Sequence, residues 1–272
     1  FFQPNNEEEI VKELIELSNP NISNNTIFIF PEGALAGVNL DKLKDFEPIF
    51  ANKFAETHLI IMGINTKKII DGSTKIYNSM VVLDNQLNLI EEYNKIKLVP
   101  FGEFLPFEKF FNKIGLRKVS YGYESFSKGK ERKLIFFDDK NFNFIPLICY
   151  EIIYSGKVNL NSNETNFIIN ISEDGWFGDS IGPHQHFSHS IFRAIEEGKN
   201  IIRASNNGIS AYIDSNGLII DKLESTHKGV IEINNYKIPK NTFFSKFGNK
   251  IFFYFLIFYI SLFFFLKKRE NK

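Results

Sequence analysis

Short apolar runs bounded by turn residues alternate with helical stretches along this 272-residue chain, and that alternation limits the folds open to it. Residues 6–18 carry three glutamates near their start, at 7–9, and one apolar stripe, as expected of a surface helix. A strand is expected at 26–30, a helix at 40–56 that Pro48 interrupts, and another strand at 58–64. This order predicts an α/β fold with helices covering mainly parallel sheets.

The second half of the chain continues the same pattern. A helix is expected near 187–197, and further strands are expected at 75–83, 87–93, 133–137, 142–148, 167–171, 201–204, 209–214, 218–222 and 230–233. The turns at 84–86, 138–141 and 215–217 predict hairpins. Residues 98–132 have no clear period but many apolar side chains, which indicates a functional loop.

Polar residues that could carry chemistry follow three of these strands. Glu32 comes just after the strand at 26–30, Lys95 after the strand at 87–93, and Cys149 directly after the strand at 142–148. Strand ends converge on a shared crevice in α/β folds. Cys149 is the only cysteine, so it is either a small buried apolar residue or a nucleophile. A carboxylate and a lysine at other strand ends favour the nucleophile.

Five segments around these residues resemble one known family. They are the residues PEG at 31–33, YNKIKLVPFGE at 93–103, ICYE at 148–151, DGWFGDSIGPHQH at 174–186 and RASNNGIS at 203–210. The set is similar to the nitrilase superfamily of carbon–nitrogen hydrolases, and closest to its branch of apolipoprotein N-acyltransferases from bacterial inner membranes. The resemblance covers about 250 residues and implies a four-layer αββα sandwich.

The resemblance also implies a catalytic set of Glu32, Lys95 and Cys149. A thiol attacks a carbonyl as thiolate, so it needs a base and a positive neighbour. Glu32 is the expected base, and Lys95 is expected to stabilise the thiolate and the oxyanion of the tetrahedral intermediate. Lys97 is the rival lysine, but the spacing of the 93–103 segment favours Lys95.

Four further residues are expected to assist. Glu103 lies eight positions beyond Lys95, and the family resemblance places it facing the site. Tyr150 would offer its backbone N–H to the oxyanion, and Glu151 is expected to support the site. Trp176, in a glycine-rich turn, is expected to contact substrate, although tryptophan in such a run is ordinarily core.

A cluster of apolar residues in the long loop has two interpretations. Its members, between 101 and 111, include Phe107 and Phe110. They either pack inside as core or form an entrance through which a lipid chain reaches the thiol. We expect the second, with Phe107 and Phe110 binding substrate.

Metal, cofactor and nucleic acid are not expected. His184, His186 and His189 are close in sequence, but a zinc site needs three or four ligands in a set geometry, and these histidines can instead cap a helix or shape a pocket. Lys+Arg and Asp+Glu balance at 32 each, without a basic stripe, which argues against nucleic-acid binding.

The chain ends in an unbroken apolar run at 251–266, followed by Lys267, Lys268 and Arg269. At 1.5 Å per residue it spans roughly 24 Å, slightly less than a bilayer core, and flanking lysines can close the difference. We expect a transmembrane helix with a cytoplasmic tail and a periplasmic catalytic domain. The expected division is residues 1–240 for the catalytic domain and 241–272 for the anchor.

The chain begins at Phe1 within what resembles the end of a first strand, and members of the branch carry membrane helices before that point. We therefore expect a fragment of a multi-pass inner-membrane protein. The leading hypothesis is transfer of a fatty acyl group from a phospholipid, through a Cys149 thioester, to the α-amino group of a diacylglyceryl-modified lipoprotein. A membrane-tethered nitrilase or amidase, or a non-enzymatic binding protein, are the alternatives.

Overall fold

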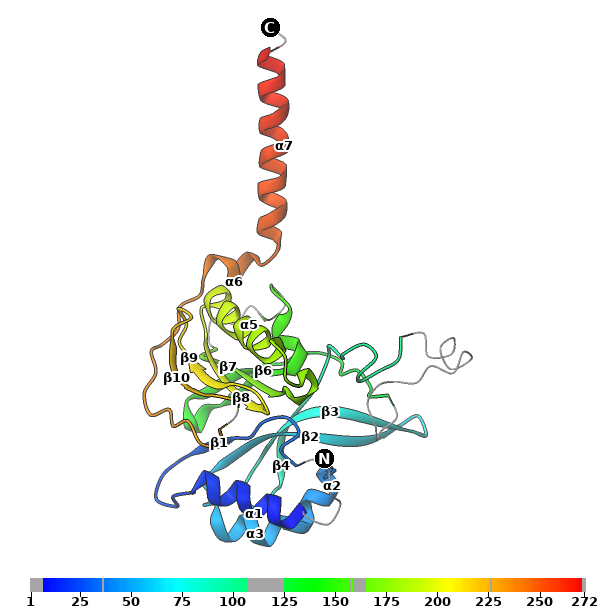
Figure 1. Cartoon of the computed structure of the whole chain (residues 1–272), viewed down its shortest axis with the longest axis vertical. Coiled ribbons are helices and arrows are strands. Elements are labelled where there is room, and N and C mark those ends of the chain that lie inside the picture. The colour runs from blue at the N-terminus through cyan, green and yellow to red at the C-terminus, as the bar shows by residue number, and fades with distance from the viewer. Residues whose placement is uncertain are drawn as a thin grey trace.

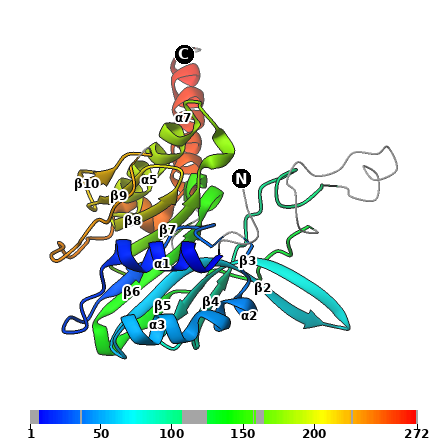
Figure 2. The ribbon, with the colours of Figure 1, turned by 60° about the horizontal axis from the view of Figure 1, so that its bottom comes forward.

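The computed structural model describes residues 7–35, 37–106, 125–156, 158, 165–225 and 227–270. Two β-sheets face each other, with helices on their outer sides (Figure 1). One long helix projects away from this body in both views (Figures 1 and 2).

The first sheet has the strand order β1-β2-β3-β4. Its strands are β1 Ile27–Ile29, β2 Leu59–Ile70, β3 Ser73–Leu83 and β4 Leu89–Asn94. Only β1 and β2 run parallel. β2, β3 and β4 form consecutive antiparallel pairs, because short turns that join neighbouring strands reverse the chain. The predicted turn at 84–86 does join two such strands, and β2 is longer than expected.

The second sheet has the order β10-β9-β8-β7-β6-β5. Its strands are β5 Ile135–Phe137, β6 Phe142–Ile148, β7 Phe167–Glu173, β8 Asn200–Asn206, β9 Ser210–Ile213 and β10 Ile219–Leu223. The central strands β6, β7 and β8 are parallel, and the outer pairs are antiparallel. Both sheets are therefore mixed, and the expectation of mainly parallel sheets holds only for the edge pair β1 and β2 of the first sheet and for the central strands β6, β7 and β8 of the second.

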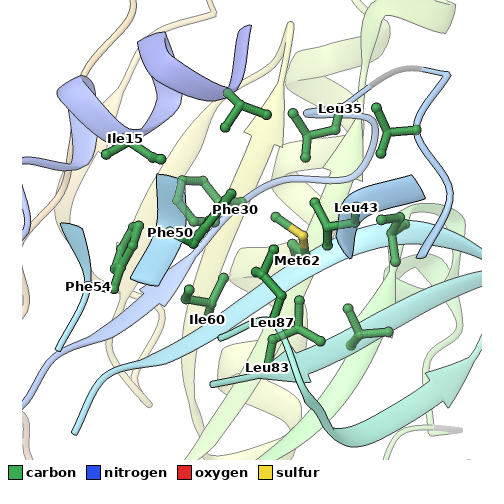
Figure 3. Close-up of a cluster of buried hydrophobic side chains, with 14 residues drawn as sticks. Ile15, Phe30, Leu35, Leu43, Phe50, Phe54, Ile60, Met62, Leu83 and Leu87 are labelled. Atoms are coloured by element: carbon green, nitrogen blue, oxygen red, sulfur yellow. The ribbon is translucent and has the colours of Figure 1, made fainter. Parts of the chain in front are cut away.

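Three clusters of buried apolar side chains match the three spaces between four layers. One joins α1 Glu7–Ser18 and α3 Glu47–Lys53 to the first sheet, through residues such as Ile15, Phe50 and Met62 (Figure 3). A second fills the space between the sheets, and a third lies between the second sheet and α5 Gly182–Glu197. The predicted αββα sandwich is confirmed.

Three local expectations differ from the structure. The helix expected at 40–56 is two helices, α2 Leu40–Leu43 and α3, joined by the 3-10 turn η1 Lys44–Phe46. Pro48 lies in the first turn of α3, where its missing N–H costs nothing. α5 begins at Gly182, earlier than expected. The strand expected at 230–233 is wrong: the segment is irregular, although Ile231 and Ile233 still pack on the core between the sheets.

The C-terminal part consists of the short helix α6 Phe243–Phe247 and the helix α7 Lys250–Glu270. Among the described residues, α7 is the one helix long and apolar enough to cross a membrane by length and composition, and none of that span is buried in the protein. Helix α6 packs on α5 and places α7 at the outer side of the second sheet (Figure 1).

Candidate active site

The ends of three strands bring Glu32, Lys95 and Cys149 together at the interface of the sheets. Glu32 follows β1, Lys95 directly follows β4, and Cys149 directly follows β6 as the first residue of the 3-10 helix η3 Cys149–Ile153. The backbone N–H of Lys95 donates to the carbonyl oxygen of Asn78 on β3, at 2.9 Å, which continues the strand pairing to the lysine. Each residue lies at a strand end, as its sequence position predicts.

Lys95 is enclosed by two carboxylates. Its Nζ lies 2.9 Å from Oε1 of Glu103 and 3.6 Å from Oε1 of Glu32, and its side chain is only 1% exposed. The Nδ2 of Asn78 donates to the same two oxygens, at 2.6 Å to Glu32 and 2.7 Å to Glu103. Asn78, which sequence reasoning missed, therefore fixes the distance between the two carboxylates.

The second oxygen of each carboxylate accepts a backbone N–H. Oε2 of Glu103 is 2.8 Å from the nitrogen of Val99, and Oε2 of Glu32 is 2.9 Å from that of Glu173. Gly63 on β2 allows this approach, because a Cβ there would lie 2.6 Å from the Cα of Glu32. The carboxylate of Glu32 is thus held in one orientation beside Lys95.

Cys149 has a backbone φ of +48°, in the left-handed region that side-chain-bearing residues rarely adopt. Its side chain is 8% exposed. Burial and the Glu32 carboxylate raise the pKa of the thiol to about 12, while Lys95 and a hydrogen bond with Ser172 act to lower it. The resting residue is therefore a thiol, with both a carboxylate and an ammonium group close enough to affect its ionisation.

Lys95 remains charged despite its burial. Burial alone would lower the pKa of this lysine, but Glu32, the thiolate form of Cys149 and Glu103 together raise it above its ordinary value. Lys97 lies elsewhere, with its Nζ 5.5 Å from the ring centroid of Tyr154. Of the two lysines, Lys95 is thus the one that can stabilise negative charge at Cys149.

Glu151 holds the turn after Cys149 against the strand end that carries Lys95. Both of its oxygens lie 2.8 Å from the hydroxyl of Tyr93, and Oε1 also accepts the backbone N–H groups of Ile96 and Lys97. Oε2 accepts the backbone N–H of Ile148 at 3.0 Å. The Glu151 side chain therefore supports the site by structure, because its hydrogen bonds tie the two sheets together on either side of the site.

A second polar cluster lies beneath Cys149, at the start of α5. His186 contacts Asp174 through Nδ1 at 2.8 Å and the carbonyl oxygen of Cys149 through Nε2 at 3.2 Å. Arg203 donates to Asp174 at 2.7 Å and also to the Asn170 side chain. Asp174 and Arg203 stand inside the segments that carry the family resemblance, which is the signal that could have identified them.

The structure describes two of the remaining predicted residues, Trp176 and Tyr150. Trp176 lies in the 3-10 turn η4 Gly175–Phe177, is 63% exposed, and follows Glu173, whose N–H binds Glu32. The ring of Tyr150 is half-buried and lies edge-on to that of Tyr154. Phe107 and Phe110 lie outside the described residues. Within the described part of the chain, no group of three or more His, Cys, Asp or Glu could hold a metal ion.

Comparison with known proteins gives both sequence and structural relatives. The chain is 35% identical to the apolipoprotein N-acyltransferase of Rickettsia prowazekii (strain Madrid E) over 232 residues, which are 84% of this chain and 46% of that protein. It is 34% identical to that of Wigglesworthia glossinidia brevipalpis in an alignment 278 positions long, which covers 97% of this chain and 53% of that protein. The chain thus spans about half the length of these curated relatives.

Two solved structures share the fold. A CN-hydrolase superfamily protein from Xanthomonas campestris with an arsenic adduct in its active site has a TM-score of 0.56 at 14% identity, covering 82% of this chain and 81% of that one. An amidase mutant from Nesterenkonia sp. AN1, with a fluoroacetamide-derived adduct on its active-site cysteine, has a TM-score of 0.54 at 11% identity, covering 82% of each chain. The carbon–nitrogen hydrolase family model matches residues 29–234, so this chain belongs to the carbon–nitrogen hydrolase family.

Proposed function

We propose that this chain is the catalytic part of an N-acyltransferase that carries its acyl group as a thioester on Cys149. The observation that supports the chemistry best is the meeting of Glu32 with the buried Lys95 and Cys149, where the Lys95 ammonium lies 3.6 Å from the Glu32 carboxylate and both charges act on the thiol. A base, a cation and a thiol in that arrangement suit attack on an ester or amide carbonyl.

In the first half-reaction, Glu32 takes the proton of the Cys149 thiol as the sulfur attacks the ester carbonyl of the donor. Lys95 and the backbone N–H of Tyr150 stabilise the oxyanion, because Tyr150 lies in the first turn of η3, where N–H groups have no partner within the helix. The ester bond breaks, Glu32 returns the proton to the leaving alkoxide, and a thioester remains. The acceptor amine then attacks this thioester, loses a proton to Glu32 and displaces the thiolate, which regains that proton.

The donor and acceptor are inferred from the relatives and from α7. The curated relatives are named apolipoprotein N-acyltransferases. We infer a phospholipid donor and, as acceptor, the N-terminal amine of a diacylglyceryl-modified lipoprotein. A membrane-spanning α7 would keep the domain at the bilayer, and Lys267, Lys268 and Arg269 after it favour a cytoplasmic tail and a periplasmic site in a multi-pass inner-membrane protein. We also propose that the exposed Trp176, together with Phe107 and Phe110, contacts substrate.

The test uses the full-length enzyme in lipid nanodiscs. With phospholipid alone, intact-mass analysis should find one fatty-acyl adduct, which Cys149→Ala abolishes; a diacylglyceryl lipopeptide should then remove the adduct and gain an amide. Lys95→Ala should slow adduct formation by about 10²–10³-fold, as loss of an oxyanion donor does, while the matched Lys97→Ala retains most activity. Release of free acid without a new amide would instead favour a tethered hydrolase, and no adduct under any condition would refute the thioester.

A further inference from the structure

Glu173, the last residue of β7, makes two separate sets of contacts beside the expected base. Its backbone N–H donates to Oε2 of Glu32 at 2.9 Å, and at the same position β7 pairs with β8, opposite Asn206. Both contacts belong to the backbone, so they do not depend on the Glu173 side chain. The half-buried carboxylate of Glu173 is therefore free to do something else.

That carboxylate connects loops that follow three different strands. Its Oε1 accepts the backbone N–H of Gly175 at 2.7 Å, in the turn after β7, and Nδ2 of Asn207 at 3.0 Å, in the loop after β8. Its Oε2 accepts from Nδ2 of Asn206 at 2.7 Å, and the same Nδ2 reaches the carbonyl oxygen of Gly33, after β1, at 3.4 Å. One side chain thus joins the segments that surround Glu32.

Two glycines leave room for the Glu173 carboxylate. A Cβ on Gly33 would lie 3.1 Å from its Oε2, and a Cβ on Gly175 would lie 2.7 Å from its Oε1. The second distance is shorter than real Cβ contacts, so a larger residue at 175 would push the carboxylate away from the N–H that it binds. Gly33 also has a φ of +72°, which favours glycine there for a second reason.

The turn that Glu173 holds is η4, which carries Trp176 between two anchored ends. At its start, Gly175 is bonded to Glu173. At its end, the Phe177 ring packs on Gly182, where a Cβ would lie 2.5 Å from the ring. Trp176 lies between them and is 63% exposed. A large apolar side chain that is open to solvent on an anchored turn is suited to contact a ligand, because its position is fixed before the ligand binds.

Resting on the acyl transfer proposed above, we propose that Glu173 is a positioning residue for substrate, whose carboxylate fixes the η4 turn against the loops after β1 and β8. Its backbone holds Glu32, and its side chain holds the turn that carries Trp176. The contact surface is then formed in advance, so a lipid substrate does not have to order it on binding.

A second carboxylate close to Glu32 has an electrostatic cost, which hydrogen bonds offset. Burial and the charge of Glu32 raise the pKa of Glu173, while the bonds from Asn207, Gly175 and Asn206 act to lower it. The charge alone could serve another purpose, which is to attract the acceptor amine. Reach and charge must therefore be separated by experiment.

The first experiment observes the η4 turn and needs no turnover. In full-length enzyme labelled with fluorotryptophan, the ¹⁹F signal missing from Trp176→Phe identifies Trp176. Glu173→Ala should shift this signal, whereas the control Glu8→Ala, in an exposed pair with Lys12, should not. An unshifted Trp176 signal in Glu173→Ala would overturn the proposal. Absence of an acyl adduct on Cys149 would refute the proposed function instead, and it would leave this measurement standing.

The second experiment separates reach from charge. Glu173→Gln keeps the length of the side chain and one acceptor oxygen, whereas Glu173→Asp keeps the charge but is one methylene too short. In Asp and Ala variants, the KM for phospholipid or for the lipopeptide acceptor should rise by about tenfold or more with little change in kcat, as expected for loss of a hydrogen bond to a charged acceptor; Gln should cost less. Alkylation of Cys149 by chloroacetamide, which needs no lipid contact, should change little. Unchanged KM for both substrates, or a milder effect of Asp than of Gln, would contradict the proposal.

A third variant breaks the same bond from the other side. Gly175→Ala keeps the Glu173 carboxylate but places a Cβ against its Oε1, so it should reproduce the ¹⁹F shift and the KM rise of Glu173→Ala. The two changes together should cost no more than one alone, because they remove one shared contact. Additive effects would contradict the proposal, and if Glu173→Ala does not fold, Gly175→Ala decides.

Discussion

Replacing Glu151 with Gln exchanges one carboxylate oxygen for an NH₂ group, in the middle of the contact between the two sheets. The carboxylate is 1% exposed and binds the Tyr93 hydroxyl and three backbone N–H groups, with Arg132 Nη2 3.3 Å from Oε1. A Gln amide can keep accepting at the Oε1 position. At the Oε2 position its NH₂ faces the N–H of Ile148, so two donors meet.

The cost follows from these contacts. Loss of one hydrogen bond to a charged acceptor is worth about 1.5–3 kcal/mol. Arg132 also loses the charge opposite it, and removing one member of a buried ion pair costs roughly 3–5 kcal/mol in all. We therefore expect Glu151→Gln to lower the free energy of unfolding by about 3–5 kcal/mol. In a chain of this size that lowers Tm by roughly 6–20 °C.

Differential scanning calorimetry of the full-length enzyme in detergent, with urea titration as a second measure, tests this expectation. The control is Glu91→Gln, which removes one member of the solvent-exposed pair between Glu91 and Lys133 and should cost at most about 1 kcal/mol. A Tm for Glu151→Gln within the range of that control would show that Glu151 does not hold the sheets together, and the reasoning would be wrong.

Other perturbations have effects of known sign. Glu32→Gln removes a carboxylate that raises the pKa of the Cys149 thiol. Alkylation of Cys149 at pH 8 should therefore accelerate, on the order of tenfold per pKa unit, while acyl transfer is lost. An unchanged alkylation rate would show that Glu32 lies too far from Cys149 to affect its ionisation. Burial and a neighbouring carboxylate raise the pKa of Glu197 from 4.5 to about 7, so its contribution to stability is complete below pH 4.5 and is lost as the pH rises through 7. In urea titrations, Glu197→Gln should therefore gain up to roughly 3 kcal/mol over the unaltered enzyme between pH 5 and pH 8, and a pH-independent difference would contradict this. The Phe243 side chain, 66% exposed at the start of α6, should lie in the membrane interface: a Trp there, with Trp176→Phe, should show blue-shifted emission quenched by brominated lipid, whereas water-like emission would exclude it.

The sequence predicts the strand ends well because each is marked by local chemistry. An apolar run followed at once by a nucleophilic residue marks the end of β6, and the structure has Cys149 there. The end of β4, with Lys95 directly after it, is marked by the hairpin turn before the strand and by the segment 93–103 that carries the family resemblance. The strand expected at 230–233 fails for the opposite reason. Its alternating pattern describes one side packed on the core, and an irregular segment can satisfy that pattern without pairing to a neighbour.

Contacts between distant segments could not be predicted in this way. Asn78 is an ordinary polar residue within β3, and nothing beside it in sequence indicates that it bridges Glu32 and Glu103. From the sequence, His186 was expected to cap a helix or shape a pocket. Its bond to Cys149 could not be predicted, because that bond depends on how α5 packs on η3. Three-dimensional packing decides both roles.

The segment from Ile148 to Glu151 explains why the site has so little freedom to rearrange. Successive groups of one 3-10 turn point to different elements: the carbonyl of Cys149 to His186 on α5, and the Glu151 carboxylate to the backbone of Ile96 and Lys97 beyond β4. Among the described residues no β-ladder between the two sheets sets the distance from the thiol to Lys95, since the strand pairs found there lie within one sheet or the other. That distance is instead set by the Glu151 bonds on one side and by the Asn78 and Glu103 bonds on the other. A change that loosens Glu151 should therefore move Lys95 relative to the thiol even though neither residue is altered, and thioester formation should fall before the fold is lost.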